Sequence, residues 1–383
     1  MAEWIECSIG DLCSTISDTY KGNDEYVVLV NTSDVLEGKV LNHETVANKN
    51  LKGQFKKTFK RDDILYSEIR PANKRFAYID FENTSNYIAS TKLMVLRHNE
   101  KVLPEYLFAL LKSNYVIAEL QHLAETRSGT FPQITFSSEL APMKVFLPDK
   151  DTQKRIVSIL SSIEQKIDKN NEINNNLEQQ AQAIFKSWFI DFEPFSNRKP
   201  SDWSVSTLGN VSIMGAGGDK PQNVSPIKTD LYKYPIYSNG LSNEGLYGFT
   251  DKPKISEESV TVSARGTIGF VCLRHNPYVP IVRLVTLIPK IEIVSAKYLY
   301  LWLKQLHITG TGTTQQQLTV PDFQKTEILV PSQKIVTLFT ATVEPIFEKI
   351  WANQNENEKL SSLRDTLLPK LMSGELDVSN IEI

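Results

Sequence analysis

The sequence has few of the residues from which metal sites and disulfide frameworks are built. Among 383 residues there are three cysteines and five histidines. Cys7, Cys13 and Cys272 have neither a CxxC spacing nor a histidine at ligand spacing. We therefore expect neither a zinc site nor a fold held together by disulfides.

Targeting and membrane segments are also lacking. The opening residues MAEWIEC carry acids where a signal peptide needs bases, and the longest apolar stretch, YVPIVRLVTLIP, is interrupted by Arg283. We therefore expect a soluble, cytoplasmic chain, whose length favours two or three domains. The formal net charge of −3 argues against a protein that coats nucleic acid, although local basic patches can still bind phosphates.

What the sequence does contain is an internal repeat of about half its length. The matching segments, in chain order, are EWIECSIGDL (3–12) with DWSVSTLGNV (202–211), DDILYSEIRP (62–71) with ESVTVSARGT (258–267), PEYLFALLK (104–112) with AKYLYLWLK (296–304), SGTFPQITF (128–136) with TGTTQQQLTV (311–320), and KVFLP (144–148) with EILVP (327–331). Strand-like and helix-like runs follow one another in the same order in both halves, which predicts two similar domains. The TGTTQQQLTV motif either builds the end of each domain or contacts a ligand.

A long helix is predicted after each closing proline, because apolar residues of the first recur at steps of four and three and those of the second occupy corresponding positions. In the first helix these are Ile156, Leu160, Ile163, Ile167, Leu177, Ala181, Ile184 and Trp188; in the second they are Ile346, Ile350, Leu360, Leu367 and Leu371. Asn170 and Asn174 lie in the middle of the first stripe, and Asn353 and Asn357 in the middle of the second. Since PSQKIV is shorter than PDKDTQKRIV, we expect the two helices to start a turn apart.

Antiparallel pairing of these helices would bring Asn170 to Asn357 and Asn174 to Asn353. We hypothesise that the four amides set the register, because a slip would leave them unpaired in an apolar seam. Leucines at Asn170 and Asn357 together should then leave a stable pair of uncertain alignment.

The predicted fold class is α+β, with two similar mixed α/β domains, each followed by a long helix. The two helices pair as an antiparallel coiled coil, and the whole has a pseudo-two-fold internal repeat. Such a chain imitates a symmetric dimer, for which duplex DNA is the obvious extended ligand. A helix of about 35 residues spans roughly 50 Å, which is compatible with DNA half-sites about 34 Å apart.

Three segments carry a family resemblance: AIFKSWFIDFEPF (183–195), TLLPKLMSGEL (366–376) and GTTQQQLTV (312–320). They resemble the specificity subunit of Type I restriction-modification systems, and the match covers essentially the whole chain. The resemblance implies target-recognition domains at 1–148 and 196–331, and conserved helical regions at 149–195 and 332–383. It implies recognition of a split, asymmetric sequence in double-stranded DNA, one domain per half-site.

The same resemblance implies partners. These are two methylation subunits and the restriction and translocation subunits, or, in a related arrangement, one fused restriction-methylation polypeptide. S-adenosylmethionine, ATP and Mg would belong to those partners, so no cofactor is expected on this chain. The rival interpretation is a coiled-coil scaffold that binds proteins and does not recognise a DNA sequence.

Candidate catalytic motifs are weak. Pro148 and Asp149 with Glu164 and Lys166 fit a loose nuclease pattern, but Glu164 lies in a segment of helical period. HNPYVP (275–280) has one proline too few for an adenine-methyltransferase motif, and GAGGDK (215–220) lacks phosphate-loop spacing and is expected to form a flexible turn. Since no nucleophile, base and orienting group come together, we expect no enzyme activity.

The residues expected to contact DNA fall into one group per domain. The first group is Lys52, Lys56, Lys57, Lys60, Arg61, Arg70, Asn73, Lys74 and Arg75; the second is Lys220, Lys252, Lys254, Arg265 and Thr267. The alternative for the basic run 48–61 is a solvated loop. One bidentate contact to a base discriminates by about 1–3 kcal/mol, so Arg265→Ala should weaken or relax recognition of one half-site only.

An aromatic cluster ends the first helix: Phe185, Trp188, Phe189 and Phe192, followed by Phe195. It has more rings than a two-helix seam needs. Part of it is expected to pack against the second domain, and the rest to dock partner subunits.

Overall fold

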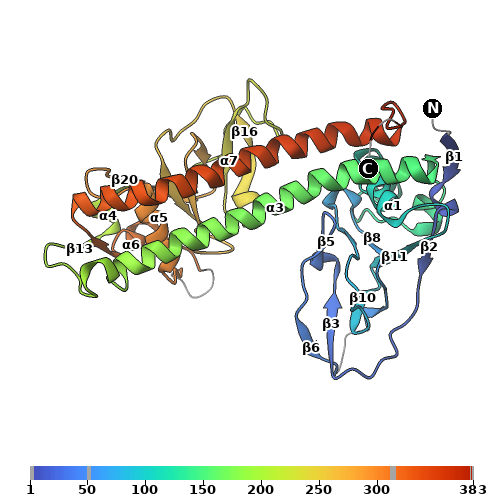
Figure 1. Cartoon of the computed structure of the whole chain (residues 1–383), viewed down its shortest axis with the longest axis horizontal. Coiled ribbons are helices and arrows are strands. Elements are labelled where there is room, and N and C mark those ends of the chain that lie inside the picture. The colour runs from blue at the N-terminus through green and yellow to red at the C-terminus, as the bar shows by residue number, and fades with distance from the viewer. Residues whose placement is uncertain (1–3, 50–52, 311–315, 380, 382–383) are drawn as a thin grey trace. The chain divides into compact units, whose positions relative to one another are not determined.

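The structure is a computed structural model that describes residues 4–49, 53–310, 316–379 and 381. It divides into two units, Met1–Lys169 with Glu356–Ile383 (unit 1) and Asn170–Asn355 (unit 2). Each unit combines one globular domain with a segment of each long helix, α3 (Lys150–Phe189) and α7 (Gln333–Met372) (Figure 1). The fold is α+β, as predicted.

Unit 1 is built on two four-stranded sheets in the part of the chain that the structure describes. Their strand orders are β2-β11-β8-β9 and β6-β3-β10-β7. The first strand pairs antiparallel with the last, Trp4 opposite Pro148, so the two ends of the domain meet. The strands are β1 (Trp4–Ser8), β2 (Cys13–Ile16), β3 (Tyr26–Val30), β4 (Val35–Leu36), β5 (Lys39–Val40), β6 (Thr45–Ala47), β7 (Phe55–Lys57), β8 (Ile64–Ser67), β9 (Phe76–Tyr78), β10 (Tyr87–Ser90), β11 (Leu93–His98) and β12 (Lys144–Pro148).

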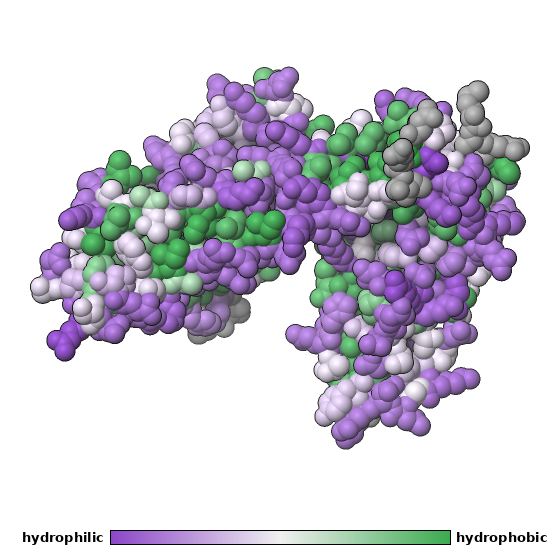
Figure 2. Space-filling view, viewed as in Figure 1, coloured by the Kyte–Doolittle hydropathy of each residue, from purple (hydrophilic) through white to green (hydrophobic). Residues whose placement is uncertain are grey.

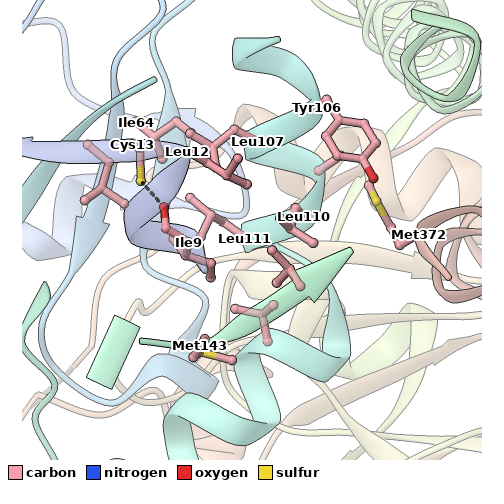
Figure 3. Packing of buried hydrophobic residues seen from close by; sticks show 14 of the residues in the cluster. Ile9, Leu12, Cys13, Ile64, Tyr106, Leu107, Leu110, Leu111, Met143 and Met372 are labelled. Atoms are coloured by element: carbon pink, nitrogen blue, oxygen red, sulfur yellow. Dashed lines mark hydrogen bonds between the residues drawn. The ribbon is translucent and has the colours of Figure 1, made fainter. Parts of the chain in front are cut away.

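The core of unit 1 includes the end of α7. The helical elements of its domain are α1 (Pro104–Leu111), α2 (Asn114–Arg127) and the short turns η1 (Ile9–Asp11), η2 (Thr32–Asp34), η3 (Pro71–Asn73) and η4 (Phe136–Leu140). Figure 3 shows side chains of η1, β2 and α1 converging, with the ring of Tyr106 directed at Met372 of α7. Burial raises the pKa of the Cys13 thiol to about 12. Cys13 is therefore a protonated core residue.

Unit 2 repeats this plan with fewer strands. Its four-stranded sheet has the order β14-β20-β17-β18, a three-stranded sheet has the order β16-β15-β19, and β13 pairs antiparallel with β21. Opening and closing strands thus meet in both units. The strands are β13 (Ser204–Thr207), β14 (Ser212–Ala216), β15 (Tyr234–Tyr237), β16 (Leu246–Thr250), β17 (Ser259–Val262), β18 (Val271–Arg274), β19 (Val279–Pro280), β20 (Val285–Pro289) and β21 (Glu327–Val330). The GAGGDK segment is not simply a flexible turn, because Gly215 and Ala216 belong to β14.

The aromatic cluster at the end of α3 lies in the core of unit 2. Phe185 and Phe189 are 0% and 1% exposed. The Phe189 ring lies 4.9 Å from the rings of both Tyr298 and Phe339 and 5.6 Å from that of Trp203. This corrects the expectation that Phe185 and Phe189 face partner subunits: the chain's own aromatic residues cover both rings. Trp188 and Phe192 are half-buried.

The remaining helical elements of unit 2 are short, apart from one domain helix. They are α4 (Leu208–Val211), α5 (Ala296–Gln305), α6 (Val320–Phe323), η5 (Glu193–Phe195) and η6 (Ser242–Gly245). The domain helix α5 corresponds to α1 in unit 1, and the two helices are formed by the repeated segments AKYLYLWLK and PEYLFALLK.

The long helices are equal in length and in phase. Each has 40 residues, and α7 follows α3 at a constant offset of 183, from Lys150 to Gln333 and from Phe189 to Met372. The expectation that they start a turn apart is therefore wrong. Each helix begins two residues after the closing proline, Pro148 or Pro331, with Asp149 and Ser332 at the position before the helix. Asp149 accepts a hydrogen bond from Thr152 N at 2.9 Å.

Within unit 2 the two helix segments run antiparallel. Asn353 Nδ2 donates to Asn174 Oδ1 at 2.8 Å, while further along α3 Phe185 lies 5.8 Å from Phe339, earlier on α7. The predicted Asn174–Asn353 pairing is confirmed. Asn170 is buried, but its proposed partner Asn357 belongs to unit 1, so that pairing stays a prediction.

The buried stripes agree with the predicted spacing and extend it. Of the predicted positions, Ile156, Leu160, Ile163, Ala181, Ile350 and Leu371 are buried. The others are half-buried, namely Ile167, Leu177, Ile184, Trp188, Ile346, Leu360 and Leu367. Additional buried positions on α7 are Val336, Phe339, Val343 and Phe347. The stripe is wider than a two-helix seam because each helix also covers a domain.

Among the described residues, no helix has both the length and the apolar character that crossing a membrane requires.

Candidate nucleic-acid interface

The repeated motif makes the same two contacts in both units. Thr135 Oγ1 accepts a hydrogen bond from Ser138 N at 3.3 Å, and Thr319 Oγ1 accepts one from Asp322 N at 3.4 Å. One residue earlier, Ile134 N donates to Glu68 O at 2.9 Å, and Leu318 N donates to Ala264 O at 3.0 Å. The threonine caps a short helix and the preceding residue clamps the loop that carries an arginine. Residues 311–315 of the motif lie outside the described residues.

The glycines of the opening repeat have a matching role. Gly10 N donates to Ala141 O at 2.9 Å and Gly209 N donates to Gln324 O at 3.0 Å. A Cβ at Gly10 would lie 3.1 Å from Ala141 Cβ, and one at Gly209 would lie 3.2 Å from Gln324 Cβ. Both backbones approach too closely to accept a larger residue without movement.

In unit 1 the arginine loop displays Arg70. Arg70 and Lys74 have positive φ angles of 45° and 52° on either side of η3. Arg70 N donates to Pro132 O at 3.1 Å, and Ala72 N donates to Gln121 Oε1 at 3.0 Å. The loop is thus held by its backbone while the side chains of Arg70 and Asn73 are exposed. Lys74 is half-buried and pairs with Glu37 at 3.5 Å.

Two of the basic residues predicted to contact DNA in unit 1 instead donate hydrogen bonds to backbone carbonyls of the same unit. Lys57 Nζ donates to Thr91 O at 3.0 Å and to Leu93 O at 2.8 Å, and burial lowers its pKa. Arg75 donates to the carbonyls of Ser33 and Val35 at 3.0 and 3.3 Å. Both side chains therefore shape the domain.

Three other basic residues of the same stretch face solvent. Lys56 and Lys60 are exposed. Arg61 is exposed and pairs with Glu82 at 2.5 Å; this hydrogen bond raises the pKa of the guanidinium. Lys52 lies outside the described residues.

In unit 2 the corresponding loop holds Arg265 by its side chain. Its Nε and Nη2 donate to Gln317 Oε1 at 3.2 and 3.0 Å. The loop is tight, as predicted, because Gly269 N donates to Ser263 O at 3.0 Å while Gly266 and Gly269 take positive φ angles of 68° and 85°. Thr267 is exposed on it.

Asn239 ties this loop to a second one. Its Oδ1 accepts from Ala264 N at 2.7 Å, and its Nδ2 donates to Val282 O at 2.6 Å. The 281–284 loop in turn bonds to Gly217 and Gly218. A Cβ at Gly218 would lie 3.8 Å from Lys254 Nζ, so that ammonium group lies beside this glycine. The structure thus gathers the Arg265 loop and Lys254 around one turn; Lys220 and Lys252 are exposed close to these residues in sequence.

Each repeated motif also borders a surface hollow. In unit 1 it has a volume of about 320 Å³ and is lined by Arg127, Ser128, Phe131, Gln133 and Thr135. In unit 2 a hollow of about 250 Å³ is lined by residues that include His307, Thr309, Gln317 and Thr319. The two hollows share the glutamine and threonine of the motif and differ elsewhere.

Asn239, Gln317 and Arg283 are not among the residues expected from the sequence, although the structure places them at or beside the Arg265 loop. The repeated motif contained Gln317, but its contact with Arg265 joins positions 52 residues apart. Asn239 precedes Gly240, a dipeptide that signals a turn. Arg283 was noticed only as a charge within an apolar run.

The described residues contain no group of three or more His, Cys, Asp or Glu side chains that could hold a metal ion. Glu164 lies in helix α3, as the helical period predicted, and pairs with Lys112 of unit 1.

The duplicated α+β framework can be compared with known protein families. A family model described as the Type I restriction modification DNA specificity domain matches residues 1–179 and 200–361. The chain belongs to this family.

Individual proteins of the same family are similar to this chain. The specificity subunit of Type I restriction enzyme HindI from Haemophilus influenzae is 34% identical over 98% of this chain and 100% of its own length. That of Type I restriction enzyme MjaIX from Methanocaldococcus jannaschii is 28% identical over 73% of this chain and 71% of its own. Among solved structures, the S subunit of a Type I restriction-modification system from M. genitalium aligns over 97% of this chain and 96% of its own, with a TM-score of 0.51 and 16% identity. That likeness concerns the fold alone.

Proposed function

We propose that this chain recognises a bipartite, asymmetric DNA site, with one domain per half-site, for a Type I restriction-modification complex. One observation carries the proposal: two units with corresponding four-stranded sheets and the same motif contacts have different arginine loops, at Arg70 and at Arg265. A shared framework with different displayed residues suits two half-sites of different sequence.

The proposed division of labour follows the four predicted segments. Residues 1–148 and 196–331 read DNA, and residues 149–195 and 332–383 connect the two readers. This division is compatible with α3 starting at Lys150 and α7 at Gln333.

In unit 1 the proposed DNA contacts are Lys56, Lys60, Arg61, Arg70, Asn73 and Lys74, with Lys52 added from the sequence. In unit 2 they are Lys220, Lys252, Lys254, Arg265 and Thr267. Lysines suit phosphate contacts, whereas arginine, asparagine and glutamine can read base edges. Lys57 and Arg75 act indirectly in this proposal, because their donors bond to carbonyls of unit 1.

The proposed partners are two methylation subunits and the restriction and translocation subunits, or a fused polypeptide that combines these activities. Exposed and half-buried apolar residues of the helix region support docking there. Figure 2 shows a green band of hydrophobic side chains along the helices of unit 2, where Leu338 is 53% exposed and Trp188 is half-buried. Trp188 and Phe192 are thus kept from the predicted partner contacts and Leu338 is added to them, whereas the buried Phe185 and Phe189 are withdrawn.

In this proposal the chain catalyses no step itself. S-adenosylmethionine, ATP and Mg are bound by the partners. Methylation of a base inside a duplex requires the base to be flipped out, so this chain holds the partners at a site whose flanks it has read.

The test is affinity selection from a random duplex library, using this chain assembled with a co-purified methylation subunit from the same host. We expect an enriched motif of two unlike blocks around a gap of fixed length. An intact, folded complex that enriches no motif would contradict the proposal and favour a protein-binding scaffold.

A further inference from the structure

A turn in unit 2 has a backbone that its residues do not favour. Leu284 N donates to Ile281 O at 3.1 Å, which closes a four-residue turn. Its central residues, Val282 and Arg283, have φ angles of 52° and 60°. Positive φ at both central positions defines a type I′ turn, for which Asn-Gly is the common sequence. A β-branched residue such as valine rarely adopts this region, because its side chain crowds the backbone.

The surroundings determine this conformation. Val282 N donates to Gly218 O at 2.9 Å and Arg283 N donates to Gly217 O at 2.8 Å. Gly217 packs so closely that a Cβ on it would lie 2.7 Å from Ile281 N. From the other side Asn239 Nδ2 donates to Val282 O at 2.6 Å. Contacts to two neighbouring segments thus hold an unfavourable turn, an arrangement that clusters at functional sites.

The turn directs an unpaired cation to the surface. Val282 is 49% exposed and Arg283 is exposed. Within the described residues the Arg283 guanidinium has no ion pair or hydrogen bond. Lys254 Nζ lies beside Gly218, whose carbonyl accepts the hydrogen bond from Val282 N. Asn239 bonds both to the turn and to the Arg265 loop. The position is therefore rigid, positively charged and joined to the candidate interface.

We propose that Arg283 reads a base edge of the half-site bound by unit 2, and that Asn239 is the positioning residue that fixes Arg283 relative to the Arg265 loop. This inference rests on the proposed function. A phosphate contact needs only a positive charge, which a flexible loop can supply. A turn held against its backbone preference fixes the position from which the arginine side chain leaves the main chain, and the planar guanidinium can then make two parallel hydrogen bonds to guanine O6 and N7.

The experiment repeats the selection with complexes of the wild-type chain and of Arg283→Ala, Arg283→Lys and Asn239→Ala. We expect Arg283→Ala to reduce discrimination at one or two base pairs of the unit 2 block by about 5- to 150-fold, with the other block unchanged. Arg283→Lys should relax the same base pairs, because lysine keeps the charge but loses the bidentate geometry.

Asn239→Ala should change those base pairs too, while the other block and the melting temperature of unit 1 stay as in the wild type. Arg198→Ala, which removes another exposed arginine of unit 2, is the matched control and should leave the motif unchanged.

The outcomes separate the two proposals. A wild-type motif that survives both Arg283 substitutions, or that Arg198→Ala alters in the same way, overturns this inference alone. Retention of the motif by Arg283→Lys, with loss only in Arg283→Ala, also overturns it, because charge would then suffice. A wild-type complex that enriches no motif overturns the proposed function and this inference with it.

Discussion

Units 1 and 2 have the same framework, but they hold their displayed arginines differently. The clamp from Ile134 N to Glu68 O has its counterpart from Leu318 N to Ala264 O. In unit 1, however, the side chain of Arg70 is exposed on a loop fixed by its backbone, whereas in unit 2 Gln317 binds the side chain of Arg265 directly. The repeated contacts are mostly made by the main chain, so side chains at the displayed positions can differ without disturbing the fold.

The units also differ in the kind of side chain that the end of a long helix contributes to each core. Phe189 of α3 and Met372 of α7 stand at the same offset. Phe189 packs among aromatic rings, whereas Met372 belongs to a core in which aliphatic side chains are the majority, and it lies beside Tyr106 (Figure 3). The same helical position therefore serves two differently built cores.

The largest predicted effect follows from that difference. Phe189→Ala should destabilise unit 2 by about 3–5 kcal/mol, because it removes a buried ring, and Met372→Ala should destabilise unit 1 by about 2–5 kcal/mol. Amide hydrogen exchange under native conditions reports the two units separately. Equal loss of protection in both units after either substitution would show that they do not unfold as separate bodies.

A smaller effect is expected at the asparagine pair of unit 2. Asn353→Ala leaves the Asn174 amide without its partner, so unfolding in urea should show a loss of about 1–3 kcal/mol. Leucine at both Asn174 and Asn353 should cost less than Asn353→Ala alone, since no unpaired amide then remains. A double variant that is less stable than the single one would contradict this account.

The half-buried carboxylate of Glu178 should make unit 2 sensitive to acid. Burial opposes its ionisation, but hydrogen bonds from Tyr300 at 2.5 Å and Lys304 at 3.0 Å outweigh burial and lower its pKa below the ordinary 4.5. Because the folded pKa is below the unfolded one, Glu178 stabilises the fold at neutral pH, and this contribution is lost as the pH falls through the folded pKa.

Glu178→Gln should therefore destabilise the chain at pH 7 by about 1–2 kcal/mol and flatten the acid limb of its stability profile. The matched variant is Glu164→Gln, which removes the partner of Lys112 at the corresponding end of α1 in unit 1. Thermal unfolding between pH 3 and about 7 tests this, and an unchanged acid limb in Glu178→Gln would be the contrary result.

The smallest predicted effect is a difference in pH dependence between the residues that precede the two long helices, Asp149 before α3 and Ser332 before α7. Hydrogen bonds from Thr152 lower the pKa of Asp149, which caps α3. Asp149→Ala should cost about 1 kcal/mol near neutral pH, and the difference from the wild type should shrink in acid, as the carboxylate of the wild type becomes protonated. Ser332→Ala at the corresponding position of α7 is the control, and its effect should not depend on pH.

Much of this architecture could be predicted from periodicity and repetition. The stripe from Ile156 to Trp188 showed the long helix, and the equal spacing of the asparagines predicted the Asn174–Asn353 pair. The fate of Phe185 and Phe189 could not be predicted, because it depends on rings such as Tyr298 and Phe339 that are distant in sequence. The roles of Lys57 and Arg75 were also hidden, since composition shows a charge but not the carbonyls to which it donates. Asn239 and Arg283 become visible only when loops 43 residues apart are seen to bond.

The central claim is that each unit reads its own half-site. The most direct measurement compares motifs selected by complexes of the wild-type chain with those selected by Arg70→Ala and Arg265→Ala. The account predicts that Arg70→Ala alters only one block of a two-block motif and Arg265→Ala only the other, with the gap length unchanged. Equal loss in both blocks from either substitution, or a motif unaffected by both, would contradict it.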